Sequence, residues 1–179
     1  MVRIFVEAAL PPGFPLNRSE LKPLLTTIQE SLGLERASYN LRLVNDAEIA
    51  RLNQQYLGCV GPTNVLSFPA DDDTDAEWRD ALDDLPGELH AALESLQTQA
   101  LPDSGPDSST EAELGGIALS VDTLVREVFL YGQDPAEHLS RLLAHALLHL
   151  SGLDHSPEMD ALTEAAVTAA TEHVAGRTE

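Results

Sequence analysis

Three histidines lie within eleven residues of the sequence: His145, His149 and His155, in the run H-A-L-L-H-L-S-G-L-D-H. Neutral imidazole is the most common side-chain metal ligand. On a helix, His145 and His149 are one turn apart and present their rings on the same face. A continuing helix would carry His155 about 9 Å beyond His149. We therefore expect the helix to end at Gly152, because glycine readily adopts the left-handed backbone of helix ends, and His155 to fold back toward the other two.

Three histidines with an open fourth position form the ligand set of a catalytic zinc site, whereas structural zinc sites use four protein ligands, mostly thiolates. Cys59 is the only cysteine, which excludes a thiolate-rich site. Asp154 precedes the third histidine and is predicted to orient an imidazole through its distal N–H, as carboxylates behind metal ligands do. The alternative is that these are core histidines with hydrogen-bond partners and that Asp154 is a turn residue, but the spacing favours the metal site.

The chemistry that this ligand set predicts is hydrolysis. Bound zinc polarises the oxygen of an electrophile and lowers the pKa of water toward about 7. Acyl and phosphodiester centres both suit such a site, so the metal ligands alone do not choose the substrate. Zincin proteases carry a glutamate directly after the first histidine as general base. Here that position is Ala146, which argues against a peptidase.

A second segment, residues 62–69 with the sequence P-T-N-V-L-S-F-P, predicts a short strand over residues 63–68. Flanking prolines suit the edge of a sheet, where their missing donors are not required. An edge strand beside a metal leaves main-chain groups that could hold an extended substrate by hydrogen bonds. Asn64 and Ser67 are the predicted polar contacts to that substrate. An ordinary edge strand without a ligand is the alternative.

Several segments resemble the YbeY family of bacterial endoribonucleases, which act in ribosomal RNA maturation. Residues 145–155 are similar to the family's zinc signature, and residues 62–69 to its second most recognisable segment. Weaker similarities cover residues 41–56, L-R-L-V-N-D-A-E-I-A-R-L-N-Q-Q-Y, and residues 114–120, L-G-G-I-A-L-S. Matches in the family's order cover most of the chain outside residues 70–113.

The resemblance implies a zinc-dependent endoribonuclease that cleaves single-stranded RNA in ribosomal RNA maturation and ribosome quality control. It implies His145, His149 and His155 as the ligands of one Zn²⁺ or another divalent transition metal. The implied partners are ribosomal RNA or the small ribosomal subunit, with no DNA substrate. It also implies a YbeY-like, zincin-like fold.

Three positions depart from the family. Leu57 follows Tyr56 where the family usually has an arginine regarded as functional; a guanidinium holds a phosphate by paired hydrogen bonds, and leucine cannot. Cys59 and Val60 replace a frequently charged pair, and Gly116 stands where the family commonly has Asp. Two alternatives therefore stay open: a non-catalytic ribosome-assembly factor in which zinc staples the fold, and a zinc hydrolase of a non-nucleic ester or amide.

Length and composition indicate one globular domain over residues 1–179. A chain of 179 residues with 43% hydrophobic content can bury a sizeable core. No apolar run approaches the 18 residues of a membrane helix, and the start lacks a signal pattern, so we expect a cytoplasmic protein with no membrane partner. The single cysteine fits a reducing compartment.

The charge argues against a substrate held by electrostatics, because phosphate contacts need Lys or Arg. The net charge is −20, from 30 acidic and 10 basic residues. Residues 71–113 hold 14 Asp and Glu against Arg79 alone. We expect residues 70–113 to form an acidic, partly mobile insertion within the domain.

The hydrophobic pattern predicts a single α+β domain, with a small mixed sheet of about four strands packed around a central metal-binding helix. Strands are predicted over residues 2–8, 38–44, 63–68 and 114–121. Helices are predicted over residues 19–33, 47–56, 121–131, 135–150 and 159–174. Other helices are expected to cover the sheet and the metal helix.

Overall fold

The computed structural model describes residues 1–70 and 112–176, and the expected insertion over residues 70–113 lies almost wholly outside them. In chain order the elements are β1 (Val2–Val6), α1 (Arg18–Ser31), β2 (Ser38–Val44), α2 (Asp46–Leu57), β3 (Val65–Pro69), β4 (Glu113–Ser120), α5 (Val121–Tyr131), α6 (Pro135–Leu150) and α7 (Pro157–Ala175). Among these helices, none is long and apolar enough to cross a membrane.

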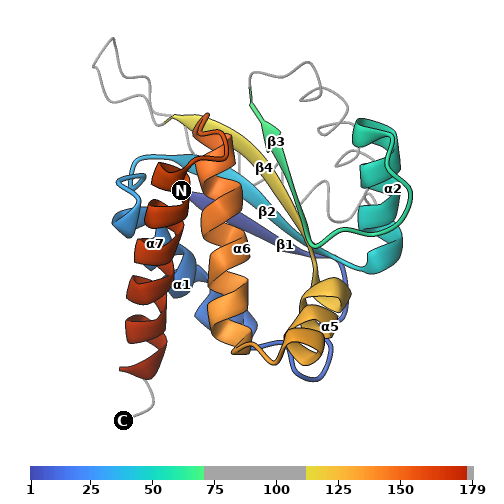
Figure 1. Cartoon of the computed structure of the whole chain (residues 1–179), viewed down its shortest axis with the longest axis horizontal. Helices are drawn as coiled ribbons and strands as arrows, with labels where there is room; N and C mark the ends of the chain where they lie inside the picture. Colours follow the sequence, from blue (N-terminus) through green and yellow to red (C-terminus); the bar gives the residue numbers. More distant parts are fainter. Residues whose placement is uncertain (71–111, 177–179) are drawn as a thin grey trace, which may run out of the picture.

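The four strands form one mixed sheet in the order β1-β2-β4-β3 (Figure 1). β1, β2 and β4 run parallel to one another, and β3 pairs antiparallel with β4. β3 therefore lies at an edge, as its flanking prolines predict. The predicted α+β class and the mixed four-stranded sheet are confirmed.

The two faces of the sheet carry separate cores, because successive side chains of a strand point to opposite faces. On one face, strand residues pack against α1, α5, α6 and α7, and they include Tyr39, Leu41, Leu43, Ile117 and Leu119. On the other face, strand residues pack against α2, and the cluster comprises Val44, Ala118, Leu66 and Phe68 with Ile49 and Leu52.

α6 lies across the first of these faces, at the centre of the molecule (Figure 1). It begins with Pro135, and the side chain of Asp134 accepts hydrogen bonds from the backbone N–H groups of Ala136 and Glu137. Proline at the first helical position and an aspartate cap are strong helix starts. Leu143 and Leu147 are fully buried. The histidines of α6 therefore project from a helix that the core holds in place.

Predicted and observed element ends differ by at most two residues, and β1, predicted over residues 2–8, ends at Val6. α1 starts before Ser19 because Asn17 caps it: its side chain accepts from the N–H of Ser19, and the side chain of Glu20 accepts from the N–H of Asn17. This reciprocal pair is a capping box. The helix predicted over residues 19–33 is therefore present, and its N-terminal cap is Asn17.

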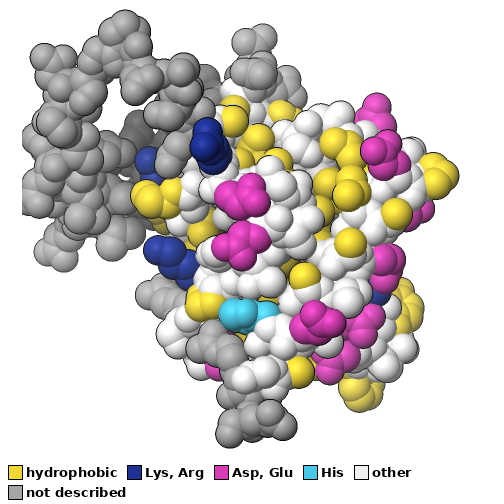
Figure 2. Space-filling model, turned by 90° about the vertical axis from the view of Figure 1, so that its left-hand side faces the viewer, with side chains coloured by type: hydrophobic (Ala, Val, Ile, Leu, Met, Phe, Trp, Pro, Cys, Tyr) yellow, Lys and Arg dark blue, Asp and Glu magenta, His cyan; other side chains and the backbone are white. Residues whose placement is uncertain are grey.

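Charge divides unevenly between the two described parts of the chain. Residues 1–70 carry six acidic and six basic residues, whereas residues 112–176 carry ten acidic residues and two arginines. Figure 2 shows acidic side chains spread over the face on the side of α7. The acidic surplus is therefore not confined to the insertion, and it extends over the part of the chain that contains α6.

Candidate metal centre

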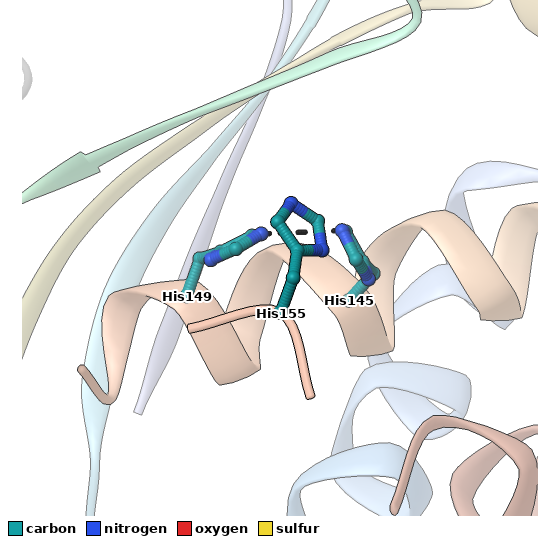
Figure 3. Close-up of side chains that lie close together, drawn as sticks. All are labelled: His145, His149 and His155. Carbon is teal, nitrogen blue, oxygen red and sulfur yellow. Dashed lines mark hydrogen bonds between the residues drawn. The ribbon is translucent and has the colours of Figure 1, made fainter. Parts of the chain in front are cut away.

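The three histidines of the sequence motif meet in space (Figure 3). His145 and His149 project from adjacent turns of α6, and His155 comes from the segment that follows the helix. Their potential ligand atoms all lie within 4.8 Å of one another. The ring centroids are 4.6 to 5.0 Å apart. The structure thus brings together the residues that the spacing singled out, and in residues 1–70 and 112–176 no other such group occurs.

The turn that returns His155 is built around Gly152. The backbone of Gly152 has a φ of +87°, in the left-handed region that glycine tolerates best. The N–H of Leu153 donates to the carbonyl of Leu148 at 3.0 Å, back across the end of the helix. A left-handed glycine followed by this bond is the Schellman ending of a helix. The helix therefore ends where the sequence predicts, and the chain reverses.

A main-chain carbonyl orients the ring of His149. Its Nδ1 lies 3.0 Å from the carbonyl oxygen of Leu153. A carbonyl only accepts hydrogen bonds, so Nδ1 must carry the proton. In the neutral ring, Nε2 is then left unprotonated, with its lone pair available to a metal. This partner is the one that sequence reasoning missed, since a backbone carbonyl has no signature in a side-chain pattern.

The geometry fits a divalent ion. The Nε2 atoms of His145 and His149 are 3.2 Å apart. Two nitrogens bound at 2.0–2.1 Å to one tetrahedral ion are about 3.3 Å apart. Imidazole donors suit zinc and other divalent transition metals. His145, His149 and His155 could therefore hold one ion of this class.

The surroundings of His145 favour the neutral ring that a metal requires. Burial is the main cause that lowers its pKa, and the neighbouring His149 and His155 lower it further. Asp160 acts in the opposite direction without reversing the effect.

Asp154 directly precedes His155 in the segment that follows α6. Its side chain is exposed. Within the described residues, no hydrogen bond joins its carboxylate to any of the three rings, and the Leu153 carbonyl serves His149 instead. An orienting role for Asp154 stays a prediction.

The two predicted substrate contacts are engaged with the protein. The hydroxyl of Ser67 donates to the carbonyl of Ala146 at 3.2 Å, which holds β3 against α6 beside His145. The amide nitrogen of Asn64 lies 3.3 Å from both carboxylate oxygens of Glu127 on α5. Both side chains therefore fix the position of β3, and a role in binding substrate stays a prediction.

Glu127 links three elements in one network. Its carboxylate accepts from Asn64 before β3 and lies 2.8 Å from Nε2 of His138 on α6. His138 is buried. It is not part of the histidine group, as its distance of two helical turns from His145 predicts. Sequence reasoning could not find this network, because no local pattern connects residues on three separate elements.

Four arginines of the described residues have carboxylate partners. The pairs are Arg42 with Glu7 and Glu48, Arg51 with Glu48, Arg126 with Asp46, and Arg141 with Glu137 and Glu164. Leu57, the last residue of α2, is 62% exposed. An arginine there would therefore have room to reach solvent or a ligand.

Comparisons with known proteins agree with the geometry. The profile of the family described as "Endoribonuclease YbeY" matches residues 16–173. A protein named Endoribonuclease YbeY from Oleidesulfovibrio alaskensis is 40% identical over 185 residues, covering 99% of this chain and 97% of that protein. One of the same name from Nitratidesulfovibrio vulgaris is 41% identical over 157 residues, covering 87% and 86%. The solution structure of TM1509 from Thermotoga maritima has the same fold, with a TM-score of 0.57 at 20% identity, covering 99% of this chain and 93% of that one.

Proposed function

Since the chain belongs to the endoribonuclease YbeY family, we propose that it is a metal-dependent endoribonuclease that cleaves single-stranded RNA. The observation that carries the proposal is the convergence of three imidazoles within 4.8 Å. Zinc, the ion proposed here, supplies a Lewis acid that polarises a phosphodiester and lowers the pKa of water when bound. We propose further that the substrate is ribosomal RNA, that the partner is the small ribosomal subunit and that the location is the cytoplasm.

Different residues of the chain hold the metal, orient its ligands and position the edge of the sheet. His145 and His149 stand on a helix fixed by the core, so their separation is set before an ion binds. The carbonyl of Leu153 keeps the proton of His149 on Nδ1 and leaves Nε2 to face the site. Ser67 holds β3 against α6 beside His145. An extended RNA strand could therefore lie between the edge of the sheet and the histidines.

A cleavage assay with metal analysis tests the proposal. The protein is stripped with a chelator, reloaded with zinc, and its metal content is measured before it is mixed with single-stranded RNA. We expect cleavage of single-stranded RNA and not of duplex RNA or DNA. His149→Ala should abolish both metal binding and cleavage, whereas His173→Ala, a histidine on α7 outside the group, should keep both. RNA left intact by fully metallated protein would contradict the proposal.

A second candidate is a non-catalytic assembly factor, and one observation favours it. Leu57 stands at the position of the family's arginine, and the arginines considered above are already paired with carboxylates. This candidate predicts that metallated protein sediments with small ribosomal subunits while their RNA stays uncut. Sedimentation and cleavage measured on the same sample separate the two candidates.

A further inference from the structure

The main-chain groups along the outer edge of β3 follow from its pairing with β4. The N–H of Ser120 donates to the carbonyl of Asn64 at 2.9 Å, and the N–H of Ala70 donates to the carbonyl of Leu114 at 3.0 Å. In an antiparallel ladder, alternate residues bond the partner strand. The register then leaves three residues with their main-chain groups turned to the outer edge: Val65, Ser67 and Pro69.

This edge is poor in donors. The N–H of Val65 donates to the side-chain oxygen of Asn64 at 2.8 Å. Pro69 has no N–H. Only the N–H of Ser67 remains, and in residues 1–70 and 112–176 no hydrogen bond reaches the carbonyl of Val65, Ser67 or Pro69. Among the described residues, the edge therefore leaves three acceptors and one donor.

β3, the strand that carries these acceptors, packs against α6, the helix that carries His145 and His149. The bond from Ser67 to Ala146 places the middle of the edge next to His145. Figure 3 shows β3 running along the same side of α6 as the three rings. A substrate positioned at the histidines would therefore meet the edge of β3.

We propose that the edge of β3 recognises hydrogen-bond donors of an unpaired RNA strand, its ribose 2′-hydroxyls and exocyclic amino groups, and does not hold its phosphates. The inference rests on the proposed function and states which groups of the RNA the site recognises. Carbonyl oxygens accept from hydroxyl and amino groups and repel phosphate oxygens. The 2′-hydroxyl is the group by which a protein distinguishes RNA from DNA.

The same inventory disfavours a peptide substrate. A peptide that adds to a sheet edge needs donors and acceptors in alternation along that edge. Two of the three outward donors are missing here, because Asn64 occupies one and Pro69 lacks the other. Contacts through RNA donors are also more compatible with the acidic surplus of residues 112–176 than contacts through phosphate charges.

Binding measurements with modified oligonucleotides test the inference without requiring turnover. Fluorescence anisotropy with zinc-loaded protein compares one short unpaired RNA with its 2′-fluoro, 2′-deoxy and methylphosphonate forms. The first two lack 2′-hydroxyl donors, and the last lacks phosphate charge. We expect the 2′-fluoro and 2′-deoxy forms to bind about tenfold more weakly, as the loss of one or two hydrogen bonds predicts. The methylphosphonate form should bind within about twofold of RNA.

Salt dependence gives an independent reading. For single strands, the logarithm of the binding constant falls with the logarithm of salt concentration by about 0.7 per neutralised phosphate. Recognition through donors predicts a slope shallower than about −1. A stronger effect of methylphosphonate than of 2′-fluoro, a slope steeper than about −2, an extended peptide that binds better than the RNA, or no binding of the RNA would each overturn the inference.

A pair of variants tests the same point on the protein. Ser67→Ala removes only the hydroxyl, and Ser67→Pro also removes the one free N–H of the edge. Equal RNA binding by the two, with the fold checked by circular dichroism, is expected if acceptors dominate. Further loss in Ser67→Pro would mean that the N–H holds a phosphate. Binding that depends on RNA donors, without cleavage, would support the inference and contradict the proposed nuclease activity. Cleavage together with binding that depends on phosphate charge would support the nuclease activity and contradict the inference.

Discussion

Leu153 orients the ring of His149 through its backbone carbonyl and not through its side chain. The carbonyl of Leu153 accepts from Nδ1 of His149, and its position depends on the left-handed turn at Gly152. The metal-binding nitrogen of His149 is therefore prepared by backbone geometry. A substitution of Leu153 that preserves the turn should leave the ring in place, whereas a change in the turn should not.

Leu57 marks the position where a single side chain could change the activity. We expect Leu57→Arg to raise kcat/KM for RNA cleavage by about tenfold or more, because a charge-assisted hydrogen bond to a phosphate contributes about 1.5–3 kcal/mol. Cleavage kinetics of the two proteins at equal metal content measure the effect. Leu130→Arg is the matched control, since Leu130 is 64% exposed near the end of α5 and the variant adds the same charge. Equal gains in both variants would show a general charge effect.

The residue scale also shows what the sequence could predict. The convergence of His145, His149 and His155 could be predicted from their spacing, because only one helix and one turn connect them. The carbonyl of Leu153 that orients His149 could not be predicted, since a sequence pattern displays only side chains, and the role of Asp154 stays a prediction. Asn64 was identified as polar, but its bond to Glu127 depends on how α5 packs beside β3, which no local pattern contains.

At the scale of elements, Asp46 joins α2 to the start of α5. Its carboxylate accepts from the hydroxyls of Ser120 and Thr123 at 2.7 and 2.6 Å and from Arg126 at 2.7 Å. Burial raises the pKa of Asp46, but these hydrogen bonds outweigh it and hold the pKa below its ordinary value of 3.8. The ionised carboxylate is therefore favoured by folding.

The sign of the pH effect follows from that lowered pKa. The stabilisation by Asp46 is present above the unfolded pKa and is lost as pH falls through the lower folded pKa. We expect Asp46→Asn to cost about 1–3 kcal/mol at neutral pH. The difference from the parent protein should shrink below about pH 4. Urea unfolding between neutral and acid pH measures it, with Glu30→Gln, an exposed carboxylate on α1, as a control. A difference that is constant over the whole range would contradict this role.

The ends of α6 and α1 offer a matched test of the turn. Gly152 and Gly33 both have left-handed backbones, with φ of +87° and +69°, and a Cβ at either would meet nothing within 4 Å. Alanine at either position should cost about 1–2 kcal/mol in backbone strain. We expect Gly152→Ala also to weaken zinc binding, because the turn delivers His155 and the Leu153 carbonyl, and Gly33→Ala to leave it unchanged. Zinc titration and thermal unfolding of both variants measure these effects, and equal zinc affinity would contradict a positioning role for the turn.

The elements themselves were largely predictable, and for a physical reason. α6 and β3 have patterns set by their own burial: an apolar face at helical spacing, and a short run between prolines. The order of strands in the sheet depends on contacts between distant segments and could not be worked out in detail. The pattern predicts the start of α1 one residue late, since Asn17 and Ser19 are both favourable cap residues and only the backbone conformation distinguishes the two.

At the scale of the whole molecule, the net charge and the hydrogen-bonding groups of the candidate site both favour short-range contacts over attraction of phosphate. Residues 112–176 carry ten acidic residues and two arginines, and both Arg126 and Arg141 pair with carboxylates. A surface of this kind does not attract RNA from a distance. Recognition must then depend on short-range contacts, which is what an edge rich in carbonyl acceptors provides.

The distribution of the metal ligands predicts how the molecule responds to chelation. All three histidines come from α6 and the turn after it, whereas the main core joins α1, α6, α7 and the sheet without them. Metal bound only to the native state stabilises it by about 3–4 kcal/mol at 100 to 1,000 times the dissociation constant. A domain with an ordinary stability of about 5–15 kcal/mol remains folded after losing this contribution. We therefore expect chelation to lower the unfolding temperature while the helical circular dichroism and a cooperative transition persist, and zinc to have no effect on His149→Ala. Loss of helical signal at room temperature on chelation would mean that the ion staples the fold, because only then would the core depend on three side chains outside it.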